Sequence, residues 1–332
     1  MSLILSEIHK FLFEGLPVRG VLVRLTDAWQ EVLARRNANT THGAYPPPVQ
    51  DLLGELAAAA VLLQSNIKFD GALVLQIFGD GPVKLAVVEV SSDFGLRATA
   101  TVVGPVAADA TFSQLVNVGN TGRCAITLDP KTRQPGQQPY QGVVPLSDAQ
   151  HAKFGSVAAV LQHYMLQSEQ LDTMLVLASD DRVAAGLLIQ RLPVQGVGNL
   201  AGNAPDVSTS AADPLEDYRR IATLAASLKA TELRELDAQT VLYRLFWEEK
   251  LLHFVPLQGA QGPHFSCTCS RERVARMILG LGADEAASVL QERPDIEVGC
   301  DFCGAQYHFD AVDVAQIFHQ SDPPSQISTA LQ

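Results

Sequence analysis

Four cysteines near the end of the chain are the residues best suited to chemistry. Cys267 and Cys269 form a C-x-C pair, and after thirty intervening residues Cys300 and Cys303 form a C-x-x-C pair. These pairs contain four of the five cysteines in the 332 residues. Such an arrangement has three chemical uses: a four-thiolate metal site, two disulfides, or a site that alternates between these states.

Zinc is the metal that four thiolates favour, because each short pair can supply two sulfurs to a tetrahedral site. The intervening chain can fold by itself, since helices are predicted at 271–281 and 284–292, a hairpin at 296–298 and 306–309, and a last helix at 312–319. Ser270 and Asp310 are suited to cap the first and last of these helices. The sequence therefore predicts a small four-cysteine zinc domain.

Two histidines, His264 and His308, lie close to the pairs in sequence. Four cysteines already complete a zinc shell, so we expect neither histidine to be a ligand. The fifth cysteine, Cys124, lies in a β-rich segment, and we expect it to be a buried structural thiol.

The residues leave two interpretations of the zinc site open. In the first, zinc only stabilises a module of about 60 residues with little core of its own. In the second, zinc holds the cysteines as thiolates, so that oxidation within either pair removes two ligands and expels the metal. Structural zinc contributes about 10–16 kcal/mol of apparent binding energy, so its loss would unfold the module. The second interpretation predicts a redox switch.

Three other functions compete for the same pattern. A thiol oxidoreductase needs a lone C-x-x-C pair at a helix start, whereas Cys300 lies in a predicted hairpin. A zinc hydrolase or deaminase needs an open coordination position, which four cysteines close. A nucleic-acid binder would use Arg271, Arg273 and Arg276, but the net charge of the chain is −12. We therefore expect no enzyme activity and no nucleic-acid partner.

Composition indicates a globular protein, with 47% hydrophobic and 18% charged residues. The first ten residues contain Glu7 and lack the basic start and uncharged run of a secretory signal. The longest apolar run, residues 56–63, is too short to span a bilayer. We expect a cytoplasmic protein without a membrane partner, in a compartment where disulfides do not persist as structural links.

The first 195 residues contain helices and strands in blocks. Apolar residues recur at helical spacing at 4–12, and further helices are predicted at 27–36, 49–65 and 148–167. Strands are predicted at 21–25, 73–78, 83–90, 96–103, 123–128, 141–145, 174–177 and 185–192. Asp80-Gly81 between two of these strands is a strong hairpin signal. Because strands and helices do not alternate regularly, we predict an α+β fold.

The character of the chain changes after residue 195. A Pro-, Gly-, Asn- and Ser-rich connector runs to about Asp213, a plausible N-cap followed by Pro214 at the first helical position. Two amphipathic helices follow, with apolar stripes at 221–228 and 241–246. Short helices of this kind depend on docking for their stability, so they are removable in principle. We expect four parts: an α+β core domain at 1–195, a connector and metastable helical linker at 196–258, a zinc-binding redox-switch domain at 259–320 and a tail at 321–332.

Several segments outside the cysteine pairs form landmarks in a fixed order: Leu12-Phe13-Glu14, Val18-Arg19-Gly20, Lys68-Phe69-Asp70-Gly71, Gly79-Asp80-Gly81-Pro82, Tyr140-Gln141-Gly142-Val143-Val144 and Ser168-Glu169-Gln170-Leu171. Together with segments 267–273 and 300–304, they make the chain resemble the bacterial redox-regulated chaperones of the heat-shock protein 33 family. The resemblance runs from about residue 8 to residue 318. The loop at 37–45, the connector at 194–212 and the tail after 320 look longer than the family needs.

The resemblance implies an ATP-independent holdase. In the family, the reduced protein binds one Zn²⁺ and is inactive; oxidants then form disulfides between neighbouring cysteines, release zinc and unfold the linker. The oxidised protein dimerises and holds unfolding client proteins against aggregation. Carried over to this chain, the zinc ligands are Cys267, Cys269, Cys300 and Cys303. The redox-active disulfides join Cys267 with Cys269 and Cys300 with Cys303, and the linker lies at about 213–257.

Overall fold

The computed structural model describes residues 5–39, 43–132, 136, 138–193 and 214–319. The chain forms two compact units, Met1–Ser266 and Cys267–Gln332. The first unit contains both helices and sheets, and the small second unit holds all four paired cysteines. This arrangement confirms the predicted α+β class. The connector, Asp213 and the tail lie outside the described residues. The division into four parts stays a prediction.

The first sheet of the first unit has the strand order β10-β1-β2-β9-β8, and β11 also pairs with β1. All its pairings are antiparallel. The strands are β1 (Glu7–Phe13), β2 (Val18–Leu25), β8 (Thr173–Ser179), β9 (Ala184–Arg191), β10 (Leu251–His253) and β11 (Leu257–Gln258).

The second sheet has the order β12-β5-β4-β3-β6-β7. Its strands are β3 (Gly71–Phe78), β4 (Val83–Ser91), β5 (Gly95–Val102), β6 (Arg123–Pro130), β7 (Tyr140–Pro145) and β12 (His264–Phe265). The hairpin predicted around residues 79–82 is confirmed between β3 and β4. Glycine is required in its turn, because a Cβ on Gly79 would lie 2.1 Å from the carbonyl oxygen of Val83.

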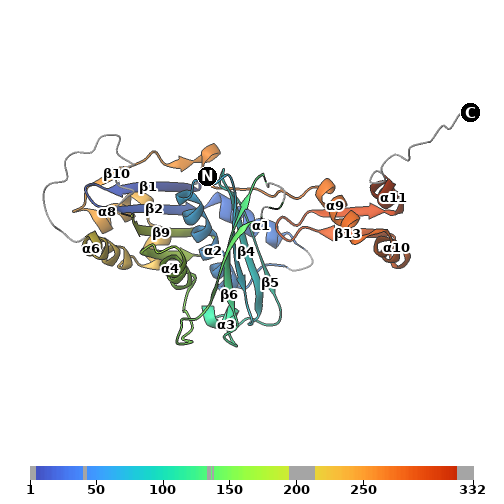
Figure 1. Cartoon of the computed structure of the whole chain (residues 1–332), viewed down its shortest axis with the longest axis horizontal. Helices are drawn as coiled ribbons and strands as arrows, with labels where there is room; N and C mark the ends of the chain where they lie inside the picture. The colour runs from blue at the N-terminus through green and yellow to red at the C-terminus, as the bar shows by residue number, and fades with distance from the viewer. Residues whose placement is uncertain (1–4, 40–42, 133–135, 137, 194–213, 320–332) are drawn as a thin grey trace, which may run out of the picture. The chain divides into compact units, whose positions relative to one another are not determined.

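Helix α2 (Pro47–Asn66), predicted at 49–65, packs against strands of both sheets and is buried on most sides (Figure 1). Its small side chains from Ala57 to Ala60 have no exposed surface, which lets both sheets approach the helix closely. The remaining helices of this core are α1 (Asp27–Asn37), α3 (Phe112–Val116) and α4 (Val157–Ser168). No described helix is long and apolar enough to cross a bilayer.

The first sheet is buried on both faces. Leu187 and Leu188 are neighbours on β9, yet they belong to different hydrophobic clusters because successive side chains point to opposite faces of a strand. Leu188 joins the cluster formed around α2. Leu187 joins the cluster beneath three helices of the predicted linker: α6 (Pro214–Ala226), α7 (Ala230–Glu235) and α8 (Ala238–Phe246).

The linker helices confirm both predicted amphipathic stripes and add α7, which was not predicted. The buried side chains of these helices, together with Leu228 between α6 and α7, belong to the second cluster: Tyr218, Ile221, Ala225, Leu228, Leu233, Ala238, Val241, Leu242 and Phe246. Burial of each valine, leucine, isoleucine or phenylalanine side chain stabilises the docked helices by about 1.5–3 kcal/mol. Docking on the sheet therefore stabilises helices that are too short to be stable alone.

Two predictions for the core were wrong. Residues 7–13 form strand β1 and no helix, because Ile8 and Phe11 face opposite sides of a doubly covered sheet, and their spacing of three only resembles a helical stripe. Helix α4 begins at Val157 and not at Asp148, whose carboxylate instead accepts backbone N–H groups in a turn. Ser156 caps α4 by accepting the N–H of Ala159 at 3.2 Å.

The second unit contains α9 (Arg271–Leu281), α10 (Ala283–Glu292), the hairpin β13 (Asp295–Gly299) with β14 (Gln306–Asp310), and α11 (Ala311–His319). The predicted helices, hairpin and caps are confirmed: Ser270 accepts the N–H of Arg273, and Asp310 accepts those of Val312 and Asp313. Its buried core is small: Val274, Ile278, Ala286, Ile296, Phe309 and Val314. A unit of this size needs further stabilisation.

Candidate metal centre

Two short segments of the second unit bring the paired cysteines together. Cys267 and Cys269 lie directly before the cap of α9, and Cys300 and Cys303 lie in the turn between β13 and β14. The turn is closed by the N–H of Cys300, which donates to Ala305 at 2.9 Å, and by the N–H of Gly304, which donates to Cys300 at 2.8 Å. Gly304 has φ +73°, a conformation that glycine adopts without strain.

All four paired cysteines can offer a sulfur to one metal ion, because their Sγ atoms lie within 4.8 Å of one another. The Sγ atoms of Cys267 and Cys300 are 3.7 Å apart, and those of Cys269 and Cys303 are 3.2 Å apart. A tetrahedral zinc site with Zn–S bonds of about 2.3 Å has sulfur–sulfur edges of about 3.8 Å. The donor set and its spacing therefore fit zinc. None of the five cysteines forms a disulfide.

Tyr307 on β14 also contacts this centre, since its hydroxyl donates to the Sγ of Cys269 at 3.1 Å. Burial opposes ionisation of Cys269, but the hydrogen bonds from Tyr307 and from the neighbouring thiols outweigh it and lower the pKa of Cys269 to about 7. Burial raises the pKa of Cys300 and of Cys303. Without a cation, the sulfur of Cys269 thus becomes a thiolate more readily than those of Cys300 and Cys303.

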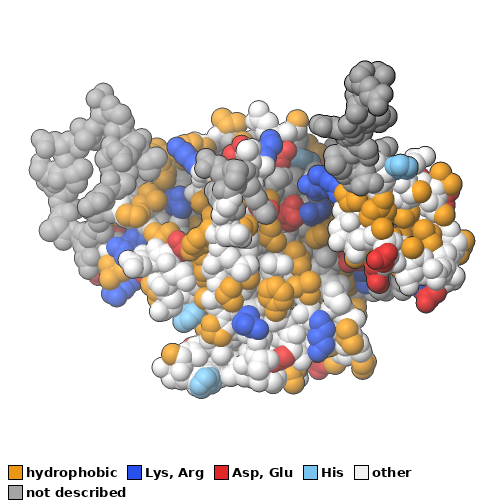
Figure 2. Space-filling model, turned by 45° about the vertical axis from the view of Figure 1, so that its right-hand side comes forward, with side chains coloured by type: hydrophobic (Ala, Val, Ile, Leu, Met, Phe, Trp, Pro, Cys, Tyr) orange, Lys and Arg blue, Asp and Glu red, His pale blue; other side chains and the backbone are white. Residues whose placement is uncertain are grey.

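Two of the three arginines weighed as a phosphate site have partners within the unit. Arg271 donates to the carbonyl of His308 at 2.8 Å and pairs with Asp313 at 2.7 Å. Arg273 donates to the carbonyl of Thr268, between the first two cysteines, at 2.9 Å. They therefore help to position the cysteine segments. Figure 2 shows basic, acidic and hydrophobic side chains interspersed over the visible face.

The other residues near the motif have different surroundings. The Nδ1 atom of His308 lies 2.7 Å from a carboxylate oxygen of Asp295, and that of His264 lies 3.1 Å from the carbonyl oxygen of Gly262. The metal-capable group among the described residues comprises the four cysteines. Cys124 is buried in β6, as predicted, and burial raises the pKa of its thiol to about 12.

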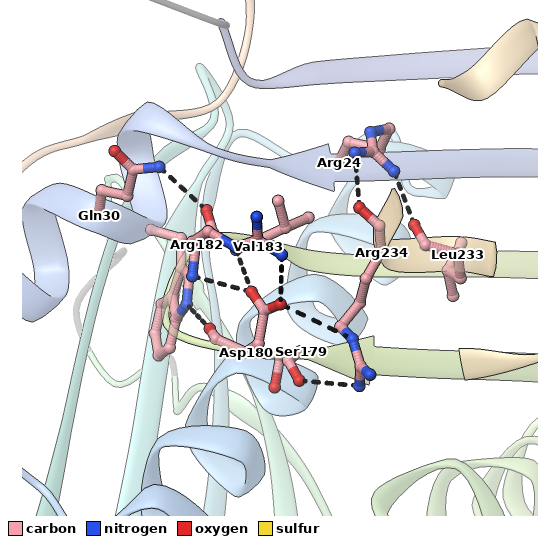
Figure 3. A network of polar contacts seen from close by, with 9 residues as sticks. Arg24, Gln30, Ser179, Asp180, Arg182, Val183, Leu233 and Arg234 are labelled. Atoms are coloured by element: carbon pink, nitrogen blue, oxygen red, sulfur yellow. Dashed lines mark hydrogen bonds and ion pairs between the residues drawn. The ribbon is translucent and has the colours of Figure 1, made fainter. Parts of the chain in front are cut away.

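A polar network in the first unit holds linker helix α7 on the core (Figure 3). Arg24, on β2, donates to the carbonyl oxygens of Leu233 at 2.6 Å and Arg234 at 3.0 Å, near the C-terminal end of the helix. These carbonyls have no partner within the helix, so a cation is favourable there. The hydrogen bonds from Arg24 therefore form only when α7 is helical and docked.

Asp180, in the turn between β8 and β9, forms the second half of this network (Figure 3). Its carboxylate lies 3.7 Å from the guanidinium of Arg234. Burial opposes ionisation of Asp180, but N–H groups of Arg182 and Val183, each donating at 2.8 Å, keep its pKa below the ordinary value. A preformed anion on the core therefore pairs with a cation on the linker.

Comparison with known proteins agrees with this arrangement. A family model described as "Hsp33 protein" matches residues 6–310. The chain belongs to the Hsp33 family. Relatives named "33 kDa chaperonin" from Chromobacterium violaceum and Methylobacillus flagellatus are each 43% identical to it, and each match covers 94% of both chains. The crystal structure of a 33 kDa chaperonin, a heat shock protein 33 homolog from Thermotoga maritima, shares the fold with a TM-score of 0.69 at 20% identity. That match covers 95% of this chain and 99% of the other.

Sequence reasoning did not find every residue of this arrangement. Tyr307 follows the last cysteine by four residues, and its place on the hairpin strand after the turn could have pointed to the sulfurs. The contacts of Arg24 and Asp180 with the linker carried no local signal, because their linker partners lie more than fifty residues away along the chain. Such contacts depend on the tertiary fold.

Proposed function

We propose that this Hsp33-family chain is a redox-regulated, ATP-independent holdase chaperone and that it is not an enzyme. In its reduced state it would bind one Zn²⁺ through Cys267, Cys269, Cys300 and Cys303 and be inactive. Oxidation would release zinc, unfold the linker and let the protein hold unfolding clients. The observation that carries the proposal is the convergence of all four motif sulfurs within 4.8 Å, beside a core too small to stand alone.

The proposed switching step is a two-electron oxidation within each pair. When bound, zinc would keep the sulfurs as thiolates. Two neighbouring thiolates then lose one electron each and form an S–S bond, while hypochlorous acid gains both electrons and leaves as chloride and hydroxide. The proposed pairs are Cys267 with Cys269 and Cys300 with Cys303. This pairing rests on the family resemblance, because in a tetrahedral site every sulfur lies near every other.

The proposed working surface lies beneath the linker helices. The face of the first sheet that they cover is apolar, with Phe11, Phe13, Val18, Leu22, Leu187 and Ile189 in its buried cluster. Unfolding the linker would expose this face together with the apolar stripes of the helices. Apolar surface of this kind can bind unfolding proteins without ATP, because burial alone supplies the driving force. We also propose that the oxidised protein dimerises and acts in the cytoplasm.

The decisive experiment measures zinc content and client aggregation in parallel. We expect the reduced protein to carry one zinc per chain and to leave light scattering by a heat-denatured client unchanged. After hypochlorite treatment it should lose zinc and suppress the scattering. Oxidised, zinc-free protein that does not protect the client would refute the proposal.

Two cysteine variants test the ligand assignment. Cys300→Ser should lose most of its zinc, because one thiolate of four is missing. Cys124→Ser is the matched control and should keep one zinc per chain, because Cys124 lies in the core of the first unit. Equal zinc content in the two variants would contradict the assignment.

A further inference from the structure

A pocket of about 170 Å³ lies in the first unit, lined by strands of both sheets and by residues at or near the ends of α2 and α4. Helix α4 packs against β8 of the first sheet, β7 of the second sheet and helix α2. Most of its wall is apolar: Leu63, Leu73, Ile126, Leu128, Met165 and Leu188. An engineered apolar cavity of about 150 Å³ is known to bind benzene. The pocket can therefore accept an alkyl chain or a small ring.

One part of the lining is cationic. Arg19 of β2 lines the pocket, and its Nε donates to the Oε1 of Gln190 at 3.0 Å. The amide of Gln190 is fixed in turn, because its Nε2 donates to Thr173 at 2.8 Å. A guanidinium has five N–H donors, so Arg19 keeps donors for a further acceptor. The guanidinium of Arg19 is thus positioned by the neutral side chains of Gln190 and Thr173.

No carboxylate of the described residues forms an ion pair with Arg19. Burial lowers the pKa of Arg19, and burial together with the nearby Arg19 charge lowers the pKa of Lys10. The acid in the pocket lining, Glu169, instead accepts the hydroxyls of Tyr164 at 2.8 Å and Tyr140 at 3.3 Å. A half-buried cation beside an apolar cavity is complementary to an anion with an apolar body.

We propose that this pocket binds a small amphipathic carboxylate, with its carboxylate on Arg19 and its hydrocarbon part against the apolar wall. A fatty acid of about six to eight carbons matches the size of the cavity. The site lies wholly within the first unit and does not involve the four motif cysteines. It is therefore independent of the proposed redox function.

The test is a calorimetric titration of the reduced full-length protein with octanoate, and with octan-1-ol as a neutral ligand of the same chain length. We expect saturable binding of one octanoate per chain and binding of octanol that is about ten- to a hundredfold weaker. Arg19→Met should weaken octanoate by the same factor and leave octanol unchanged. Arg219→Met removes an exposed arginine on α6 and should change neither affinity.

A second variant tests the cavity itself. Leu128→Trp places a large side chain at a half-buried position of the wall and should abolish binding of both ligands. Circular dichroism and the melting temperature establish that each variant is folded. Equal affinity for octanoate and octanol, an unchanged octanoate affinity in Arg19→Met, or no saturable binding at millimolar octanoate would each overturn the proposal.

Discussion

Phe246 is the side chain whose removal should most clearly release the linker. It lies at the end of α8, is 2% exposed, and packs against Phe13 with ring centroids 5.1 Å apart and against Phe11 at 6.1 Å. Truncation of a buried phenylalanine to alanine costs about 3–5 kcal/mol. If this cost reduces only the free energy of docking, Phe246→Ala should raise the population of undocked linker about 10²- to 4 × 10³-fold.

The assay is amide hydrogen exchange of the reduced, zinc-loaded protein, read by mass spectrometry on peptides from α6, α7 and α8. Exchange through local opening reports the free energy of that opening, so the rates should rise by the same factor. Tyr243→Ala is the matched control, because Tyr243 is an aromatic residue of the same helix that is 72% exposed. Its effect should be less than about 0.5 kcal/mol.

Two outcomes would refute the reasoning. Equal exchange in the Phe246 and Tyr243 variants would show that the aromatic contact does not hold the linker. An equal increase in β3 and β4 would show that the linker opens only with the whole unit. If the reasoning holds, the Phe246→Ala protein should also suppress client aggregation in part without oxidant while it keeps its zinc.

Three further predictions concern single contacts. Arg24→Met removes two hydrogen bonds to the end of α7 and should speed exchange in that helix about tenfold, whereas unchanged exchange would assign docking to apolar contacts alone. Burial and the charge of Asp51 raise the pKa of Glu55 to about 7, so Glu55 costs stability as pH rises from about 4.5 to 7. Glu55→Gln should therefore raise the free energy of unfolding by about 1–3 kcal/mol at pH 8 and leave it unchanged at pH 4, as measured by denaturant titration. Tyr307→Phe removes a hydrogen bond to the Cys269 sulfur. Where zinc already holds that sulfur as a thiolate, loss of the hydrogen bond makes it more nucleophilic, so hypochlorite-driven zinc release should be about three- to tenfold faster, measured with a chromogenic chelator. An unchanged or slower rate would contradict this role.

The parts of the fold that follow from short sequence patterns were predicted well. The cysteine spacing, the caps Ser270 and Asp310, and the Asp80-Gly81 turn all act over a few residues. The location of β1 did not follow in this way, because a strand buried on both faces loses its period of two. Strand β12 was likewise not predicted, since its two residues are held by β5, far away in the chain. Residues 259–266 therefore belong to the first compact unit.

The candidate site shows the same division. The grouping of all four sulfurs was predicted from sequence because two short segments, one before α9 and one in the β13–β14 turn, hold them. The hydroxyl of Tyr307 and the contacts of Arg24 could not be placed, because they depend on the register of a hairpin and on the docking of a helix. A spacing pattern identifies which atoms can meet, while the polar groups that tune them come from the completed tertiary structure.

The doubly covered first sheet has a consequence for the growing polypeptide. Four of its strands are complete once β9 ends at Arg191, whereas the cover of its outer face ends only at Phe246. About 55 further residues must be synthesised, which takes about 3–11 seconds at ~5–20 residues per second. During that time the nascent chain carries four strands of the apolar sheet without the helices that cover them. Each newly made molecule thus passes through an uncovered stage before its linker first closes.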